Sequence, residues 1–188
     1  MKLKYVLPSV VMAVTFLAPL RPAQAQVPVA NSAAVFTVDI VGAVQKQFKF
    51  DTPAKRATEG LKFAFQMGKP TDAATGMPSG KRQYSPITIT KAWGPSSIQM
   101  YQSFVNNETL TNVTFDFYSV DLQGKLVVTQ KIILTNATIS SIKRHIAVSM
   151  DNAPPDPREL EDITFTFQKI EFSDASGIAA VDAWAALR

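Results

Sequence analysis

The sequence predicts a mainly β fold: a small antiparallel β-barrel or two-sheet sandwich with one short α-helix. The first observation is that apolar residues alternate with other residues along most of the chain after residue 34, which is the period of a strand with one buried face. The second is that a single stretch, residues 94–108, has the period of a helix instead. The third is that turn-rich segments, residues 68–86, 121–124 and 148–159, separate the strands.

The predicted strands, taken in chain order, place their apolar residues on one face each. These residues are Phe36, Val38 and Ile40; Phe48 and Phe50; Leu61, Phe63, Phe65 and Met67; Ile87 and Ile89; Val113, Phe115 and Phe117; Leu126, Val128, Ile132 and Leu134; and Ile163, Phe165 and Phe167. After Phe167 the apolar positions change phase to Ile170 and Phe172. Such a change predicts a bulge or a strong twist, as occurs where a sheet curls towards closure.

The predicted helix would carry its apolar residues, Ile98, Tyr101, Phe104 and Val105, on one face. Ser96 or Ser97 is suited to cap its N-terminus, because a hydroxyl can accept a hydrogen bond from a free backbone N–H group. The pair Asn106-Asn107 can end it, since asparagine tolerates the left-handed conformation.

Residues 1–25 have the three parts of a secretory signal peptide. Lys2 and Lys4 precede an apolar run over residues 5–20, and Ala23 and Ala25 precede a predicted cut that would leave Gln26 as the first residue. The alternative is an uncut membrane anchor, but the run is shorter than the about 20 residues that a spanning helix needs, and it contains two prolines. We therefore expect a signal peptide over 1–25, one domain over 26–188, and an exported protein, periplasmic or extracellular, with no stable membrane span after cleavage.

The net charge argues against a nucleic-acid partner. The chain has 19 Lys and Arg residues against 15 Asp and Glu, and three of the cations (Lys2, Lys4 and Arg21) precede residue 26, which leaves 16 against 15. A nearly neutral domain has no excess of cations from which to build a basic surface. The chain also has no cysteine, so disulfides cannot staple it.

The residues offer little for catalysis. His145 is the only histidine, and neither a nucleophile elbow nor a glycine-rich phosphate loop is present. The carboxylates near residues 151–162 lie in or beside a proline-rich segment and lack the spacing of a calcium loop. We therefore expect no catalytic residues, no metal site and no cofactor.

From Tyr84 onward the order of elements is distinctive. A "PITITK" strand leads into the helix "SSIQMYQSFVNNETL", followed by "NVTFDFY", "KLVVTQKIILTNATISSI" and "LEDITFTFQKIEF", with Trp184 downstream. This pattern resembles the haemolysin-coregulated protein (Hcp) family, the tube component of bacterial type VI secretion. The resemblance covers residues 34–184; the first strands depart from the family's glycine-containing start, since only Gly42 follows "FTVDIV".

The resemblance implies a compact two-sheet barrel that assembles into hexameric rings, which stack into a hollow tube expelled through a contractile sheath. Some members carry effector cargo in the lumen, so cargo and other parts of the secretion machine are implied partners. The loop over residues 68–86 corresponds to the family's long loop that reaches towards the neighbouring ring. Lys69, Asp72, Lys81 and Arg82 are its polar residues for self-assembly; the alternative is a plain surface loop.

A signal peptide conflicts with the tube role, because family members usually reach the tube from the cytoplasm. Three hypotheses remain open. The chain is a tube component or tube-borne effector with an unusual N-terminal extension; or it is an exported relative that forms rings or binds partners without a secretion-tube role; or it is a periplasmic enzyme, with a polar cleft around a shifted carboxylate or His145.

Overall fold

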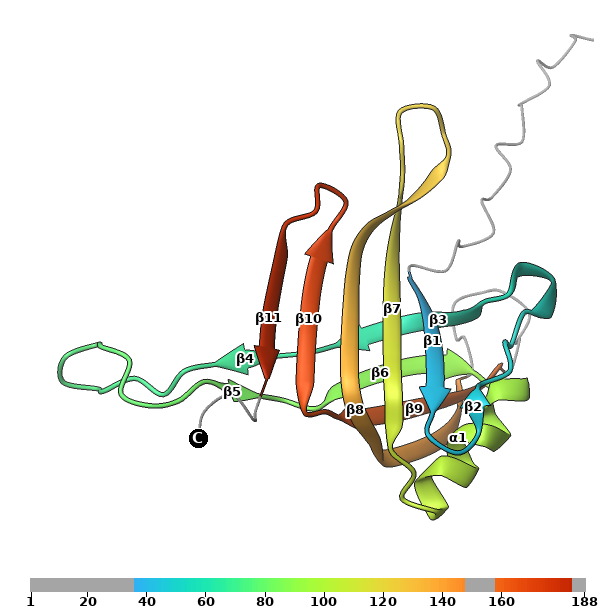
Figure 1. Cartoon of the computed structure of the whole chain (residues 1–188), viewed down its shortest axis with the longest axis horizontal. Helices are drawn as coiled ribbons and strands as arrows, with labels where there is room; N and C mark the ends of the chain where they lie inside the picture. Colours follow the sequence, from blue (N-terminus) through green and yellow to red (C-terminus); the bar gives the residue numbers. More distant parts are fainter. Residues whose placement is uncertain (1–35, 148–157, 184–188) are drawn as a thin grey trace, which may run out of the picture. The chain divides into compact units, whose positions relative to one another are not determined.

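The computed structural model describes residues 36–147 and 158–183, which lie in the compact unit that begins at Ser32. In chain order the strands are β1 (Phe36–Gly42), β2 (Lys46–Gln47), β3 (Thr58–Ala64), β4 (Met67–Gly68), β5 (Gln83–Tyr84), β6 (Ile87–Ala92), β7 (Leu110–Val120), β8 (Leu126–Ala147), β9 (Arg158–Thr166), β10 (Lys169–Asp174) and β11 (Ala179–Ala183) (Figure 1). A short 3-10 turn, η1 (Pro53–Lys55), precedes β3, and the α-helix α1 (Pro95–Val105) follows β6. The mainly β prediction with one helix is confirmed.

The strands close into a barrel because β8 pairs with two different strands along its length. Its first half pairs with β7 up to Ala137, and its second half pairs with β9 from Thr138 onward. The remaining antiparallel pairs, β9 with β6, β6 with β3, β3 with β1 and β1 with β7, complete the circuit. Between the two halves Asn136 has a φ of 50°, a left-handed conformation that asparagine tolerates and that lets the strand bend.

The inward faces of the barrel strands form one apolar core. Its buried members are Phe36, Val38, Ile40, Phe48, Ile87, Ile89, Met100, Leu110, Val113, Phe115, Ile132, Leu134, Ala137, Ile139, Ile163, Phe165 and Ile170. Phe36 lies so close to the backbone of β3 that a Cβ on Gly60 would come within 1.9 Å of its ring. A glycine is therefore required at position 60.

The phase change after Phe167 is a strand end rather than a bulge within a strand. Strand β9 stops at Thr166, and β10 begins at Lys169 on the opposite edge of β8 from β7. Strand β11, which the sequence analysis did not predict, pairs only with β10 and forms an end of the sheet. It was missed because its residues, "AAVDA", are small and lack alternation.

Two of the predicted apolar faces are wrong in part. In the face of Leu126, Val128, Ile132 and Leu134, the first two residues are exposed and only the last two are buried. Leu61 and Met67 are exposed, while Phe63 and Phe65 between them are partly buried against the core. Leu61 falls at an irregularity in the pairing of β3 with β6 between Gly60 and Lys62, and Met67 lies beyond Ala64, the last residue of β3 that pairs with β6. Phe48 is buried although it follows β2, where no regular strand continues.

The helix also differs from its prediction. It begins at Pro95, with Gly94 rather than a serine at the N-cap position. Asn107 has a φ of 48°, so the predicted left-handed end is confirmed. However, Ile98, Phe104 and Val105 are exposed, and the buried residues of α1 are Ser96, Ser97, Met100 and Ser103. The buried face of α1 is therefore made mostly of serines, and three of the four residues of the predicted apolar face lie outside it.

Candidate functional site

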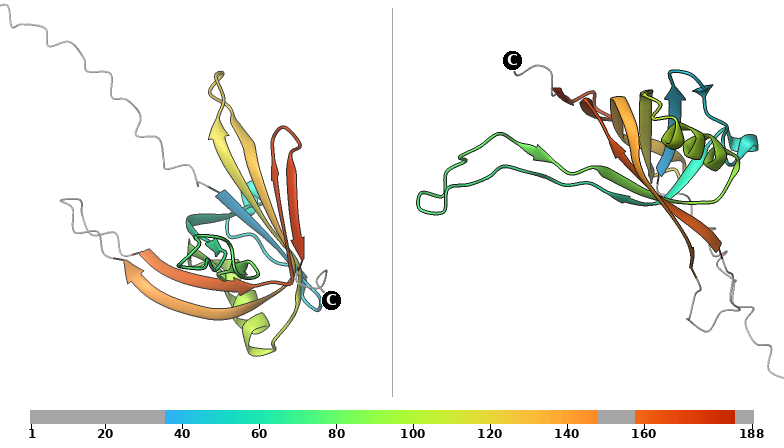
Figure 2. Two further views of the ribbon diagram at one scale, coloured as in Figure 1. Left: turned by 90° about the vertical axis from the view of Figure 1, so that its left-hand side faces the viewer. Right: turned by 90° about the horizontal axis from the view of Figure 1, so that it is seen from below.

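The loop predicted over residues 68–86 is an ordered arm. We use "the arm" for residues 67–84, which run out through β4 and return through β5, a two-stranded sheet of their own. In Figure 1 the arm starts near the lower end of β11 and projects beyond it, and in the view from below in Figure 2 it also projects away from the barrel. Because every residue from Met67 to Gln83 is exposed, the arm is a surface for contact rather than part of the core.

Asp72 shapes the tip of the arm. Its Oδ1 accepts hydrogen bonds from the backbone N–H of Ala74 at 3.0 Å, the N–H of Thr75 at 2.8 Å and the Thr75 hydroxyl at 3.0 Å. These bonds, led by the one from the Thr75 backbone, hold the pKa of Asp72 below its usual value. The carboxylate therefore stabilises the turn at the tip of the arm, as in an Asx turn.

The base of the arm is fastened to β11. The Arg82 guanidinium donates from Nε and Nη2 to the two carboxylate oxygens of Asp182, and the Tyr84 hydroxyl donates to the same carboxylate. The hydrogen bonds from Arg82 hold the pKa of Asp182 below its usual range, and Asp182 raises the pKa of Arg82. Burial, followed by the bond to Asp182, raises the pKa of Tyr84. A bidentate pair of this kind fixes direction as well as position.

The four residues predicted for self-assembly are not gathered into one cluster. Asp72 lies in the tip turn and Arg82 at the base, each with a partner inside the chain. Lys69 and Lys81 are exposed on the two sides of the arm between these points. Their role in self-assembly stays a prediction; all four are exposed, and Asp72 and Arg82 also bond within the chain.

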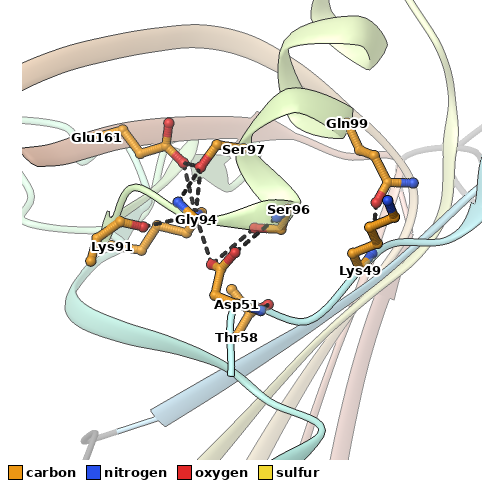
Figure 3. Close-up of polar contacts among 10 residues, drawn as sticks. Lys49, Asp51, Thr58, Lys91, Gly94, Ser96, Ser97, Gln99 and Glu161 are labelled. Atoms are coloured by element: carbon orange, nitrogen blue, oxygen red, sulfur yellow. Dashed lines mark hydrogen bonds and ion pairs between the residues drawn. The ribbon is translucent and has the colours of Figure 1, made fainter. Parts of the chain in front are cut away.

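The serine face of α1 is attached to the barrel by a buried polar cluster, drawn in Figure 3. Lys91, which has no exposed surface, lies with its Nζ 2.7 Å from Asp51 Oδ2 and 2.9 Å from Glu161 Oε1. The Ser97 hydroxyl accepts a hydrogen bond from Lys91 at 3.0 Å and donates one to Glu161 at 2.7 Å. Because a buried charge is costly unless it is paired, this cluster fixes the helix at one place on the barrel.

Asp51 caps the helix from a distant part of the chain. Its Oδ1 accepts the backbone N–H of Ser96 at 2.8 Å, and its Oδ2 accepts the Ser96 hydroxyl at 2.9 Å. A Cβ at position 94 would lie 2.4 Å from Asp51 Oδ1, so only glycine leaves room for this carboxylate. The predicted serine cap is thus replaced by a carboxylate that no local pattern reveals.

A second polar cluster holds the other end of α1. Glu108, 6% exposed, accepts hydrogen bonds from the backbone N–H groups of Val44 and Gln45, from the Gln45 side chain and from the Ser103 hydroxyl. Burial alone would raise the pKa of Glu108, but the bonds from Gln45, Val44 and Ser103 outweigh it and the pKa is lowered. Both ends of the helix are therefore anchored through polar groups.

Two groups of apolar side chains remain exposed. The first, which we call the helix patch, consists of Ile98, Phe104 and Val105 on α1. The second, the hairpin patch, consists of Val120, Leu122, Leu126 and Val128 around the turn between β7 and β8. Val120 pairs directly with Leu126, and Val128 lies two residues further along the same strand, so these three share one face of the hairpin.

The groups named in the enzyme hypothesis have the following surroundings in the described residues. Within residues 36–147 and 158–183, no three His, Asp or Glu side chains are placed to hold a metal ion. Four carboxylates in these ranges have a lowered pKa, and each has a structural role. Asp72 and Asp174 stabilise turns, whereas Glu108 holds the end of α1 and Asp182 holds the base of the arm. His145 lies 3.8 Å from Asp162 on the barrel wall. In the described part of the chain, no helix has the length and apolarity to cross a bilayer.

These features define a class: a small barrel whose distinctive parts are a projecting arm and exposed apolar surfaces. A family model described as "Type VI secretion system effector, Hcp" matches residues 39–173. The chain belongs to the Hcp family. It is also 27% identical over 154 residues to the "Major exported protein" of Pseudomonas aeruginosa PAO1, covering 81% of this chain and 87% of that protein.

Solved structures have the same fold. A crystal structure of an Hcp protein has a TM-score of 0.74 at 19% identity, covering 81% of this chain and 98% of the other. The Hcp1 protein of E. coli EAEC 042, in a double-mutant form, has a TM-score of 0.69 at 22% identity, covering 81% and 99%. The secreted protein Hcp3 from Pseudomonas aeruginosa has a TM-score of 0.60 at 20% identity, covering 79% and 99%.

The match to the Hcp family shows the general function of the chain. The chain is a type VI secretion protein of the tube or effector kind, and the alternative of an exported binding protein without a secretion role is not favoured. Membership in this family and the exported relative support secretion of the chain. The predicted cleavage residues Ala23, Ala25 and Gln26, and Trp184 of the resemblance, lie outside the described residues.

Proposed function

We propose that this chain is a self-assembling tube component that forms hexameric rings, and that the rings stack. The observation that carries the proposal is the arm: an exposed hairpin, shaped by Asp72 at its tip and fastened by Arg82 and Asp182 at its base, within a domain that matches the Hcp family. A surface element held in one direction by its own chain is preorganised for a partner, since less conformational freedom is lost on contact.

In the proposal the arm contributes a contact between copies, towards the neighbouring ring as the family resemblance implies. It leaves the barrel beside β11 and projects past it (Figure 1), where its side chains are exposed to a partner. Contacts between two different surfaces of identical copies close into a ring when the rotation allows. Lys69 and Lys81 are the exposed cations that the arm presents to that neighbour. The role is structural, with effector cargo as a second partner in the lumen.

The N-terminal segment sets the route of export. Residues 1–25 act as a signal peptide in the proposal, with cleavage after Ala25 and one domain over residues 26–188. Cleavage would deliver the rings outside the cytoplasm, whereas an uncut segment would be an extension of a tube subunit that reaches the sheath from inside. The intact mass of the purified protein separates the two routes.

The experiment is a light-scattering measurement on protein purified after expression of the full-length gene, over a concentration series. A mass of six protomers at the higher concentrations supports the ring. A mass of one protomer at every concentration contradicts it and favours an exported barrel that binds something else. Mass spectrometry on the same sample reports whether the chain starts at Met1 or at Gln26.

A further inference from the structure

A cavity of about 290 Å³ opens beside the base of the arm. We call it the arm-base cavity. Met67, Arg82 and Tyr84 line it from the arm, and Phe172, Ala180 and Val181 line it from β10 and β11. Because a water molecule takes up about 30 Å³ in the liquid, the cavity has room for a ligand of roughly ten non-hydrogen atoms.

We propose that the arm-base cavity binds a small aromatic carboxylate, with the ring of the ligand against the apolar wall and its carboxylate on Arg82. Sites for small ligands are concave and mostly apolar, with a few polar groups that converge on the ligand, and this cavity has that composition. The inference goes beyond the proposed function, since it does not depend on the formation of rings.

The apolar wall is the first support. Phe65 packs against both Tyr84 and Phe172, with ring centroids 6.2 Å and 5.8 Å apart. These contacts hold the two rings in place before a ligand arrives, so little conformational freedom is lost on binding. Met67 and Val181 are 62% and 59% exposed, and a ligand in the cavity would cover apolar surface of both. A wall of two aromatic rings and a thioether favours an aromatic ligand.

The guanidinium of Arg82 is the second support. Its Nε and Nη2 donate to Asp182, so the N–H groups of Nη1 are not used in this pair. The Arg82 side chain is 40% exposed and lines the cavity. Asp182 fixes the guanidinium in one orientation, and a ligand carboxylate can then accept a charge-assisted hydrogen bond from Nη1.

The charge around the cavity is the third support. Lys69 and Lys81 are exposed near the base of the arm. Asp72, the only carboxylate of the arm, bonds to the turn at the tip. Asp182, the carboxylate beside the cavity, is already paired with Arg82. The base of the arm therefore has an excess of cations, which favours an anionic ligand.

The test uses phenylacetate as the probe, with phenylacetamide as its uncharged match and cyclohexylacetate as its non-aromatic match. Methyl NMR, which remains usable at the mass of a ring, follows Met67 and Val181 during titration of protein expressed from the full-length gene. Ala180→Leu adds bulk inside the cavity. Ala175→Leu is the control, because Ala175 is exposed in the turn between β10 and β11 and does not line the cavity. Circular dichroism checks the folding of both variants.

We expect saturable shifts of the Met67 and Val181 signals in the wild type and in Ala175→Leu, with a dissociation constant on the order of 1 mM. Ala180→Leu should bind at least about tenfold more weakly. Phenylacetamide and cyclohexylacetate should each bind about fivefold more weakly than phenylacetate, because each lacks one of the two contacts.

The absence of saturable shifts in the wild type, or equal binding by Ala180→Leu and Ala175→Leu, overturns the site. Shifts centred on the helix patch or the hairpin patch overturn it as well. Equal binding of phenylacetamide or cyclohexylacetate overturns the class of ligand. Binding at the arm base is measured in the same way in rings and in single protomers, so a failure of the proposed function is recognised separately, by the mass from light scattering.

Discussion

The Nζ atom of Lys91 lies 2.9 Å from Oε1 of Glu161, and neither side chain has any exposed surface. The two residues are direct partners in the pairing of β6 with β9, and Asp51 adds a second carboxylate 2.7 Å from the same Nζ. One cation thus joins two strands of the barrel to the segment that caps α1. The position of the helix depends on this cluster of Lys91, Glu161 and Asp51.

Replacing the cation should be costly. Lys91→Met keeps the length of the side chain but leaves Glu161 buried without its partner, so we expect the free energy of unfolding to fall by about 3–5 kcal/mol. Chemical denaturation measures this. Lys55→Met is the matched control, since Lys55 pairs with Glu59 at the surface with 69% of its side chain exposed, and a change below about 1 kcal/mol is expected. Equal effects of the two substitutions would contradict a stabilising role of the buried cluster around Lys91.

The helix cap gives a second prediction. Gly94→Ala drives a Cβ into Asp51 and displaces the carboxylate that accepts the Ser96 N–H, so we expect a loss of about 1–2 kcal/mol, as for a lost cap. Asp51→Ala removes the same cap, so its effect and that of Gly94→Ala should not add. Gly68→Ala is the control, because a Cβ there meets nothing within 4 Å. Additive losses in the double variant would show that the two residues act separately.

Acid should release the base of the arm. The pKa of Asp182 is held below its ordinary value of 3.8, chiefly by the hydrogen bonds from Arg82. A lowered pKa means that the stabilisation is present above pH 3.8 and is lost as the pH falls through the lower, folded value. NMR signals of residues 67–84 should therefore shift to those of a mobile chain only below pH 3.8. In Asp182→Asn the arm should be mobile already at neutral pH; an arm that stays ordered in this variant would rule out the fastening.

The exposed lysines of the arm should matter for association and not for folding. Lys69→Glu with Lys81→Glu reverses the charge that the arm presents, and we expect about a tenfold higher concentration for half-assembly, because charges at the rim of a contact change association more than stability. Light scattering over a concentration series measures this shift. Lys62→Glu, an exposed position on β3, serves as the control. A double variant that assembles like wild type would mean that the arm lysines make no contact.

The alternation of apolar residues along the strands predicted the barrel. The same alternation could also have predicted the buried ion pair between Lys91 and Glu161. Lys91 continues the inward positions of Ile87 and Ile89, and Glu161 precedes those of Ile163 and Phe165. Opposite charges on the buried faces of two strands indicate a buried ion pair.

Other features had no such signal. Asp51 reaches the helix from 45 residues away, and helical periodicity identified the apolar face of α1 without indicating whether it faces the barrel. The serines are buried because Asp51, Glu161 and Glu108 accept hydrogen bonds from them, and two of these carboxylates lie far away in the sequence. The arm was predicted as a loop because its two short strands pair only with each other.

The central claim is that copies of this chain form rings. It is tested most directly by electron microscopy of protein purified from the full-length gene, imaged at several concentrations. We expect hollow rings with six-fold symmetry that stack end to end as the concentration rises. Images that contain only particles of the size of one protomer at every concentration would contradict it.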